Sequence, residues 1–134
     1  MNILLDTHIA IWALNDDPLL PAKARELIAD PDNTIYISAV SVWEIHLKHN
    51  RRPENIPFNE SLFSEACNKA GYIQLPLYGS HVLALKTINR PESSPAHNDP
   101  FDRLLIAQAK AEKMSFLTHD ELIKQYDEKT IIGV

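Results

Sequence analysis

The sequence predicts an α/β protein with a central parallel sheet flanked by helices on both faces, a three-layer α/β/α arrangement. Short apolar or β-branched runs alternate along the chain with segments whose apolar residues recur at helical spacing. The chain has 134 residues, of which 45% are hydrophobic, and this is enough for one core. We therefore expect residues 1–134 to form a single domain.

The first part of the chain supplies two strand–helix units. The apolar run at 2–5 predicts a buried strand that leads into a helix. A second helix is predicted over 21–30, because this segment begins with proline, which fits the first turn of a helix. Residues 34–38 are β-branched and aromatic, which predicts a strand, and Ser38 or Ser41 is expected to cap the helix that follows.

The second part continues the alternation. Gly71 is expected to end a helix in the left-handed conformation. The segment 89–98 is rich in proline and serine and is predicted to be a surface loop. The elements predicted here are helices over 59–71, 80–88 and 101–112, strands over 72–75, 115–118 and 130–134, and a short helix before the last strand.

Composition excludes several classes of function. The single cysteine, Cys67, excludes an intramolecular disulfide and a thiolate metal cluster, and we expect it to be a buried structural thiol. The three glycines form no phosphate-binding loop. The net charge of -5 argues against a broad basic face for nucleic acid. With no secretory leader and no apolar run near the ~20 residues that span a bilayer, we expect a cytoplasmic protein without membrane contact.

Acidic residues follow nearly every predicted strand. Ligands of a parallel α/β sheet bind outside the carboxyl ends of its strands, so these acids are expected to converge there. Converging carboxylates repel one another unless a cation compensates them, and hard oxygen ligands suit Mg²⁺ or Mn²⁺. Such sites support nuclease or phosphatase chemistry. The candidate metal ligands are Asp6, Glu44, Asp99, Asp102 and Asp120.

Each acid also has a purely structural explanation. Asp6, Asp99 and Asp120 stand where predicted helices begin and suit helix caps. Asp102 lies three residues after Asp99, in a position typical of a capping box. Glu44 suits an ion pair with the lysine four residues later. It is less favoured that all five acids have only these structural roles than that they share one metal site.

Basic and aromatic side chains give two further expectations. Trp12 and Trp43 lie on apolar helical stripes and are predicted to be core residues rather than platforms for nucleic acid bases. One local basic patch suits phosphate binding beside the metal, with a solvated helix end as the alternative. This patch consists of His46, Lys48, His49, Arg51 and Arg52.

Other hydrolase and signalling classes are disfavoured. A haloacid-type phosphatase would carry a second aspartate where His8 stands, and a receiver domain would need paired acids after the first strand. A late strand followed by lysine would also mark a receiver, but here Thr118 is followed by histidine and aspartate. No serine lies in a nucleophile elbow and Cys67 has no evident base partner, which excludes a covalent hydrolase.

Four segments of the chain form a recognisable set. They are Leu5-Asp6-Thr7, Val42-Trp43-Glu44-Ile45, the stretch from His97 to Ala109, and Leu117-Thr118-His119-Asp120. Together these segments resemble the PIN-domain proteins of the VapC toxin type. The resemblance covers almost the whole chain, and 99–109 is its most specific part.

The resemblance implies a single PIN-like domain that acts as a metal-dependent endoribonuclease, the toxin of a toxin–antitoxin pair. It further implies RNA as substrate, Mg²⁺ or Mn²⁺ as cofactor, a homodimer, and a cognate antitoxin whose tail enters or occludes the acidic pocket. A catalytically inactive PIN-like scaffold that binds RNA or a protein partner is the alternative.

The resemblance also assigns roles residue by residue. Asp6 and Asp102 are expected to bind the metal directly, and Glu44 either binds it or positions the attacking water. Asp120 corresponds to a more variable fourth catalytic acid, acting directly or through water, and Asp99 to an extra acid. Which of Asp99 and Asp102 is the direct ligand stays open, because both lie near one helix face.

Three neighbouring residues also receive roles. Thr7 and Thr118 match polar positions that orient the carboxylates. Arg103 is expected either to contact a phosphate or to pair with a neighbouring acid.

Overall fold

Five parallel strands form one sheet in the order β3-β2-β1-β4-β5. The computed structural model describes all residues from 1 to 134. The strands are β1 (Asn2–Leu5), β2 (Thr34–Ser38), β3 (Ile73–Leu75), β4 (Ser115–Thr118) and β5 (Ile131–Gly133). The predicted parallel sheet is confirmed, and every predicted strand is present.

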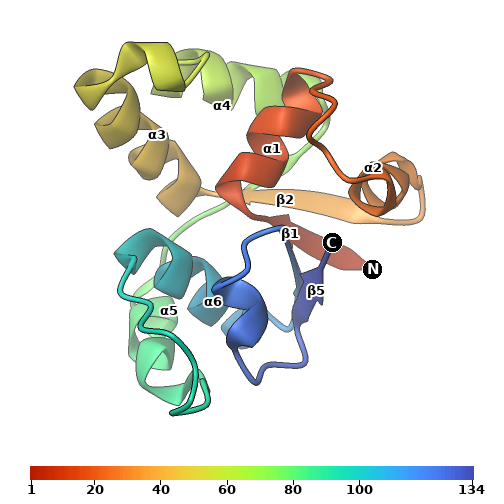
Figure 1. The fold of residues 1–134 in the computed structure, drawn as a ribbon. Coiled ribbons are helices and arrows are strands. Elements are labelled where there is room, and N and C mark those ends of the chain that lie inside the picture. The colour runs from red at the N-terminus through yellow and green to blue at the C-terminus, as the bar shows by residue number, and fades with distance from the viewer.

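Six α-helices and three short 3₁₀ helices connect the strands. Helices α1, α2 and α4 lie on one side of the sheet and α5 and α6 on the other, with α3 beside α4 (Figure 1). Their bounds are α1 (Thr7–Leu14), α2 (Ala22–Ala29), α3 (Ala39–Arg51), η1 (Pro53–Asn55), α4 (Glu60–Lys69), α5 (Gly79–Leu83), η2 (Ala84–Thr87), α6 (Pro100–Glu112) and η3 (Ile123–Gln125). None of these helices is long and apolar enough to cross a membrane.

The sheet is buried on both faces and separates two apolar clusters. Successive side chains of a strand point to opposite faces, so Ile3 and Leu5 enter one cluster while Leu4 enters the other. In β4, Phe116 and Leu117 divide in the same way. This double burial explains why these strands read as continuous apolar runs and not as alternating ones.

The topology creates a switch point between β1 and β4. From β1 the chain moves outward to β2 and β3, then returns to the other side of β1 to form β4 and β5. A reversal of this kind leaves a crevice at the carboxyl ends of the two strands, where ligands bind in open α/β sheets. The backbone N–H of Asp6 donates to the carbonyl oxygen of Leu117 at 3.0 Å and fixes the two strand ends side by side.

Two of the predicted helices differ from the structure. The helix expected over 80–88 ends at Leu83 and continues as η2, where the Thr87 hydroxyl donates to the carbonyl oxygen of Ala84 at 2.7 Å and favours a tight turn. The short helix before the last strand is only the 3₁₀ turn η3. The cap of α3 is Ser38, whose hydroxyl accepts from the N–H of Val40.

The prediction for Trp43 is wrong, and that for Trp12 holds in part. The Trp43 side chain is 48% exposed and packs edge-on against Phe101 on α6, because it lies on the outer side of α3. Trp12 is partly buried and packs against the larger cluster. Cys67 is buried as predicted, and burial raises the pKa of its thiol to about 12.

Candidate metal centre

Asp6 lies at the carboxyl end of β1, at the switch point. One carboxylate oxygen accepts from the N–H of Thr7 at 2.8 Å, which makes Asp6 the cap of α1, and the other accepts from the hydroxyl of Thr118 at 2.7 Å. The pKa of Asp6 is raised to about 6, mainly by burial and further by the negative charges of Glu44 and Asp120. The hydrogen bond from Thr118 acts in the opposite direction and lowers it. Capping and a role in the site are therefore compatible for this residue.

Glu44 is buried on α3 and is held from two sides. The hydroxyl of Thr7 donates to one carboxylate oxygen at 2.7 Å, and the ammonium group of Lys48 donates to the other. The Thr7 hydroxyl also lies 2.8 Å from that of Ser41. The pair with Lys48 is the one expected from sequence, but Glu44 is only 2% exposed, so it is not a surface pair. Thr7 and Thr118 orient carboxylates, as predicted.

Asp102 lies in the first turn of α6 and faces the other acids. Its pKa is raised to about 8, first by burial and then by the negative charges of Asp6, Asp99, Glu44 and Asp120, in that order. Four carboxylates from four different segments of the chain thus act on one side chain. The sequence expectation that the acids gather at one edge of the sheet agrees with this arrangement.

Asp99 caps α6, and Asp120 accepts from the backbone of the turn that leads into η3. One oxygen of Asp99 accepts from the N–H groups of Phe101 and Asp102 at 2.9 and 3.0 Å. One oxygen of Asp120 accepts from the N–H groups of Leu122 and Ile123 at 2.8 and 3.1 Å. Each cap uses a single oxygen, so the second oxygen of each carboxylate has no partner in the chain.

The acids fit a hard divalent cation by their chemistry. Carboxylate oxygens are the ligands that Mg²⁺ and Mn²⁺ prefer, and a cation would relieve the repulsion that raises the pKa of Asp102. The side chains are not already gathered around one point, since no three acidic, histidine or cysteine side chains are placed to hold an ion together. Lys48 and His97 occupy oxygens of Glu44 and Asp102 in this arrangement.

Comparison with known protein families agrees with the fold. The sequence matches the family described as PIN domain over residues 3–129. The chain belongs to the PIN-domain family. Among curated proteins, none matches the sequence.

Two solved structures resemble this PIN domain. The first is the crystal structure of VapBC2 from Rickettsia felis bound to a DNA fragment from their promoter, with a TM-score of 0.68 and 16% identity over 100% of this chain and 99% of that chain. The second is the crystal structure of FitAcB from Neisseria gonorrhoeae, with a TM-score of 0.52 and 20% identity over 90% of this chain and 89% of that chain. At these identities the likeness concerns the fold.

The PIN domain holds Asp102 through a buried pair that sequence reasoning missed. His97 Nε2 lies 3.0 Å from the Asp102 carboxylate, and His97 Nδ1 lies 2.8 Å from the hydroxyl of Tyr126. Arg103 donates to the same hydroxyl at 3.2 Å and pairs with no acid, so of its two predicted roles the ion pair is wrong and the phosphate contact stays a prediction. His97 stands within the quoted motif, but nothing local in the sequence links it to Tyr126.

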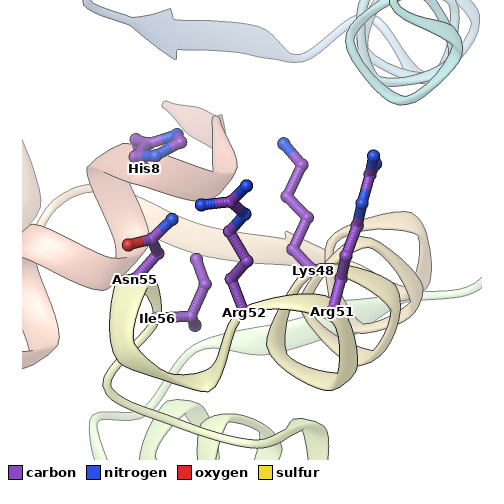
Figure 2. A pocket seen from close by; sticks show the side chains of 6 residues that line it. All are labelled: His8, Lys48, Arg51, Arg52, Asn55 and Ile56. Carbon is purple, nitrogen blue, oxygen red and sulfur yellow. The ribbon is translucent and has the colours of Figure 1, made fainter.

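A basic pocket of about 300 Å³ (Figure 2) adjoins the acids through Lys48, which donates to Glu44. It contains three members of the predicted basic patch but neither of the two histidines. His46 instead pairs with Glu60 at 3.1 Å, and His49 Nδ1 lies 3.1 Å from the carbonyl oxygen of Ile56. The pocket is lined by His8, Lys48, Arg51, Arg52, Asn55 and Ile56.

The raised pKa of Asp102 predicts that Asp102→Asn stabilises the metal-free PIN domain at alkaline pH. Between pH 3.8 and about 8, the folded protein keeps a proton on Asp102 that the unfolded chain has lost, so stability falls as the pH rises through this window. We expect the variant to exceed wild type in unfolding free energy by roughly 1–3 kcal/mol at about pH 8.5, and to differ little near pH 5.

Urea unfolding in EDTA at the two pH values measures this difference. Asp16→Asn on the surface is the control, because that carboxylate is 84% exposed. If Asp102→Asn changed the unfolding free energy equally at both pH values, ionisation of the Asp102 carboxylate would not be the cause of the predicted destabilisation.

Proposed function

We propose that this PIN domain is a metal-dependent endoribonuclease that hydrolyses RNA phosphodiester bonds at the acidic site with Mg²⁺ or Mn²⁺. The observation that carries the proposal is the electrostatic coupling of Asp102 to four other carboxylates at the switch point of the sheet. Uncompensated, this cluster is unfavourable for the fold, which argues that it is kept for a cation.

The residues have distinct roles in this proposal. Asp6 and Asp102 hold the ion directly, Glu44 holds it or positions the attacking water, and Asp120 acts directly or through water. A bound ion supplies a water nucleophile of lowered pKa and stabilises the leaving oxygen. Asp99 caps α6 and adds negative charge, so it is the weaker candidate for direct ligation.

Hydrogen bonds from neighbouring residues hold the carboxylates of Asp6 and Glu44 in place. Thr118 and the N–H of Thr7 fix Asp6, and the Thr7 hydroxyl fixes Glu44. Lys48 compensates Glu44, and the pKa of Lys48 is raised by its hydrogen bond and charge contact with Glu44 against the effect of burial. These contacts fix the orientation of the Asp6 and Glu44 carboxylates.

We further propose that the protein is the toxin of a toxin–antitoxin pair, homodimeric and cytoplasmic, with a cognate antitoxin as partner. The resemblance to VapC-type toxins across the acidic motifs supports this, as does the common fold with the VapBC2 chain of Rickettsia felis. Co-expression in a bacterium supplies a test: the chain alone should arrest growth, and a cognate antitoxin should restore it.

A non-catalytic scaffold that binds RNA or a protein partner is the second candidate. It is favoured by the absence of three side chains already placed around one ion. It is also favoured by Lys48 and His97, which occupy two of the carboxylates. On this alternative the acids would be protonated or paired, without a metal.

Cleavage of a cellular RNA pool separates the two candidates. Purified protein is incubated with Mn²⁺, Mg²⁺ or EDTA, and wild type is compared with Asp102→Asn and Asp99→Asn. We expect cleavage only with metal, its loss in Asp102→Asn, and a loss of no more than about tenfold in Asp99→Asn, because asparagine also caps helices. A folded wild type that leaves all RNA intact in both metals would favour the scaffold.

A further inference from the structure

The basic pocket holds positive charge that the protein does not neutralise. The chain has a net charge of -5, yet Arg51 and Arg52 form no ion pair, while Arg25 is paired with Asp16. Both arginines are exposed, and neither guanidinium group lies within ion-pair distance of an acidic side chain. Unpaired charge in a concave site points to an anionic ligand.

The pocket is assembled from two parts of the chain that lie far apart in sequence. His8 comes from α1, and Lys48 and Arg51 come from α3. Arg52 directly precedes the turn η1, and Asn55 is its last residue. Figure 2 shows the Arg52 guanidinium pointing toward His8 and Asn55, with the Lys48 amine extending on the same side. Nitrogen donors of Arg52, His8 and Asn55 thus lie close together, with Lys48 and Arg51 along the same wall, an arrangement suited to an oxyanion.

The pocket adjoins the acidic site directly. Lys48 lines the pocket and also donates to Glu44. His8 lines the pocket and a second hollow of about 260 Å³, whose other walls include Asp6 and Asp120. The basic pocket and the acidic site are therefore neighbours, linked through Lys48 and His8.

We propose that the basic pocket binds a phosphate of the RNA strand adjacent to the phosphate that is cleaved. Arg51 and Arg52 supply the charge, and Asn55 and His8 supply hydrogen bonds to the phosphate oxygens. A guanidinium group can donate two parallel hydrogen bonds to two oxygens of one phosphate, which favours a phosphodiester as the ligand. The inference rests on the proposed function, because only a nucleic acid substrate at the acids brings a second phosphate to this place.

Binding in the absence of metal isolates this inference from catalysis. A fluorescein-labelled 12-nucleotide single-stranded RNA is titrated with the full chain in EDTA, and anisotropy is followed at several salt concentrations. The variant is Arg51→Gln together with Arg52→Gln, and the control is Arg25→Gln on α2, outside the pocket. Thermal unfolding confirms that both variants fold.

We expect the double variant to bind RNA about tenfold more weakly at low salt, with a salt slope reduced by about 1.4, since each lost contact with single-stranded phosphate contributes ~0.7. The control should match wild type in both. Unchanged affinity and slope in the double variant would overturn the inference.

A second arm replaces the RNA with a labelled poly-glutamate peptide. If the double variant loses binding of the peptide and keeps that of RNA, the pocket is a site for an acidic protein segment and the inference is wrong. If RNA binding falls as expected while wild type cleaves no RNA with Mn²⁺ or Mg²⁺, the pocket stands and the proposed function fails. The two failures are thus distinguishable.

Discussion

Asp6→Asn is expected to lower the rate of RNA cleavage more than about a hundredfold. Mutation of a residue that only hydrogen-bonds to a metal ligand typically lowers metal affinity or activity by about 10–100-fold, and Asp6 is proposed to be a ligand itself. Asparagine can still accept from the N–H of Thr7 and can donate to the hydroxyl of Thr118, so the fold should survive. The measurement is the initial rate of cleavage with saturating Mn²⁺.

Asp16→Asn is the matched control for this loss. Asp16 is an exposed aspartate outside the site, and the same substitution there should leave the rate within a factor of about two, as expected for surface changes. A rate within tenfold of wild type in a folded Asp6→Asn would contradict the role of Asp6 as a ligand.

Phe116→Ala is expected to have the largest effect on stability. Phe116 is fully buried at the centre of β4, where it packs with Leu4, Leu105 and other members of the smaller cluster. Removal of a buried phenyl ring costs about 3–5 kcal/mol through lost transfer energy and the cavity left behind. Such a loss is a large share of the stability of a small domain.

The unfolding free energy from urea titration measures this effect. Leu83→Ala is the control, because its side chain is 66% exposed and its removal should change stability by less than about 0.5 kcal/mol. A loss below ~1 kcal/mol for Phe116→Ala would mean that the smaller cluster does not pack around this ring as described.

The sheet and the acids were predictable because their signals are local. Strand β2 was predicted with the same bounds, since residues 34–38 are β-branched and aromatic and turn residues precede them. The parallel order of strands and helices then placed Asp6 and Asp120 at one edge. The cap of α4 at Asn59 and its left-handed end at Gly71 also follow from local chemistry.

The remaining features depend on contacts between distant segments. The link between His97 and Tyr126 joins residues 29 apart, and no periodicity reveals it. His8 lines the basic pocket and His46 does not, because α1 and α3 lie close together in the fold. The sequence prediction chose His46 because it considered only neighbours on one helix. Trp43 lies outside the core because its side of α3 faces Phe101 and solvent, a choice set by tertiary packing.

The central claim is that the five carboxylates bind a divalent cation, and calorimetric titration with Mn²⁺ tests it most directly. We expect wild type to bind Mn²⁺ more tightly at pH 8.5 than at pH 6 and to release protons on binding at pH 6, because the pKa values of Asp6 and Asp102 are raised to about 6 and about 8. The double variant Asp6→Asn with Asp102→Asn should show no binding. Equal affinity of wild type and this variant, or no Mn²⁺ binding by folded wild type at either pH, would contradict the claim.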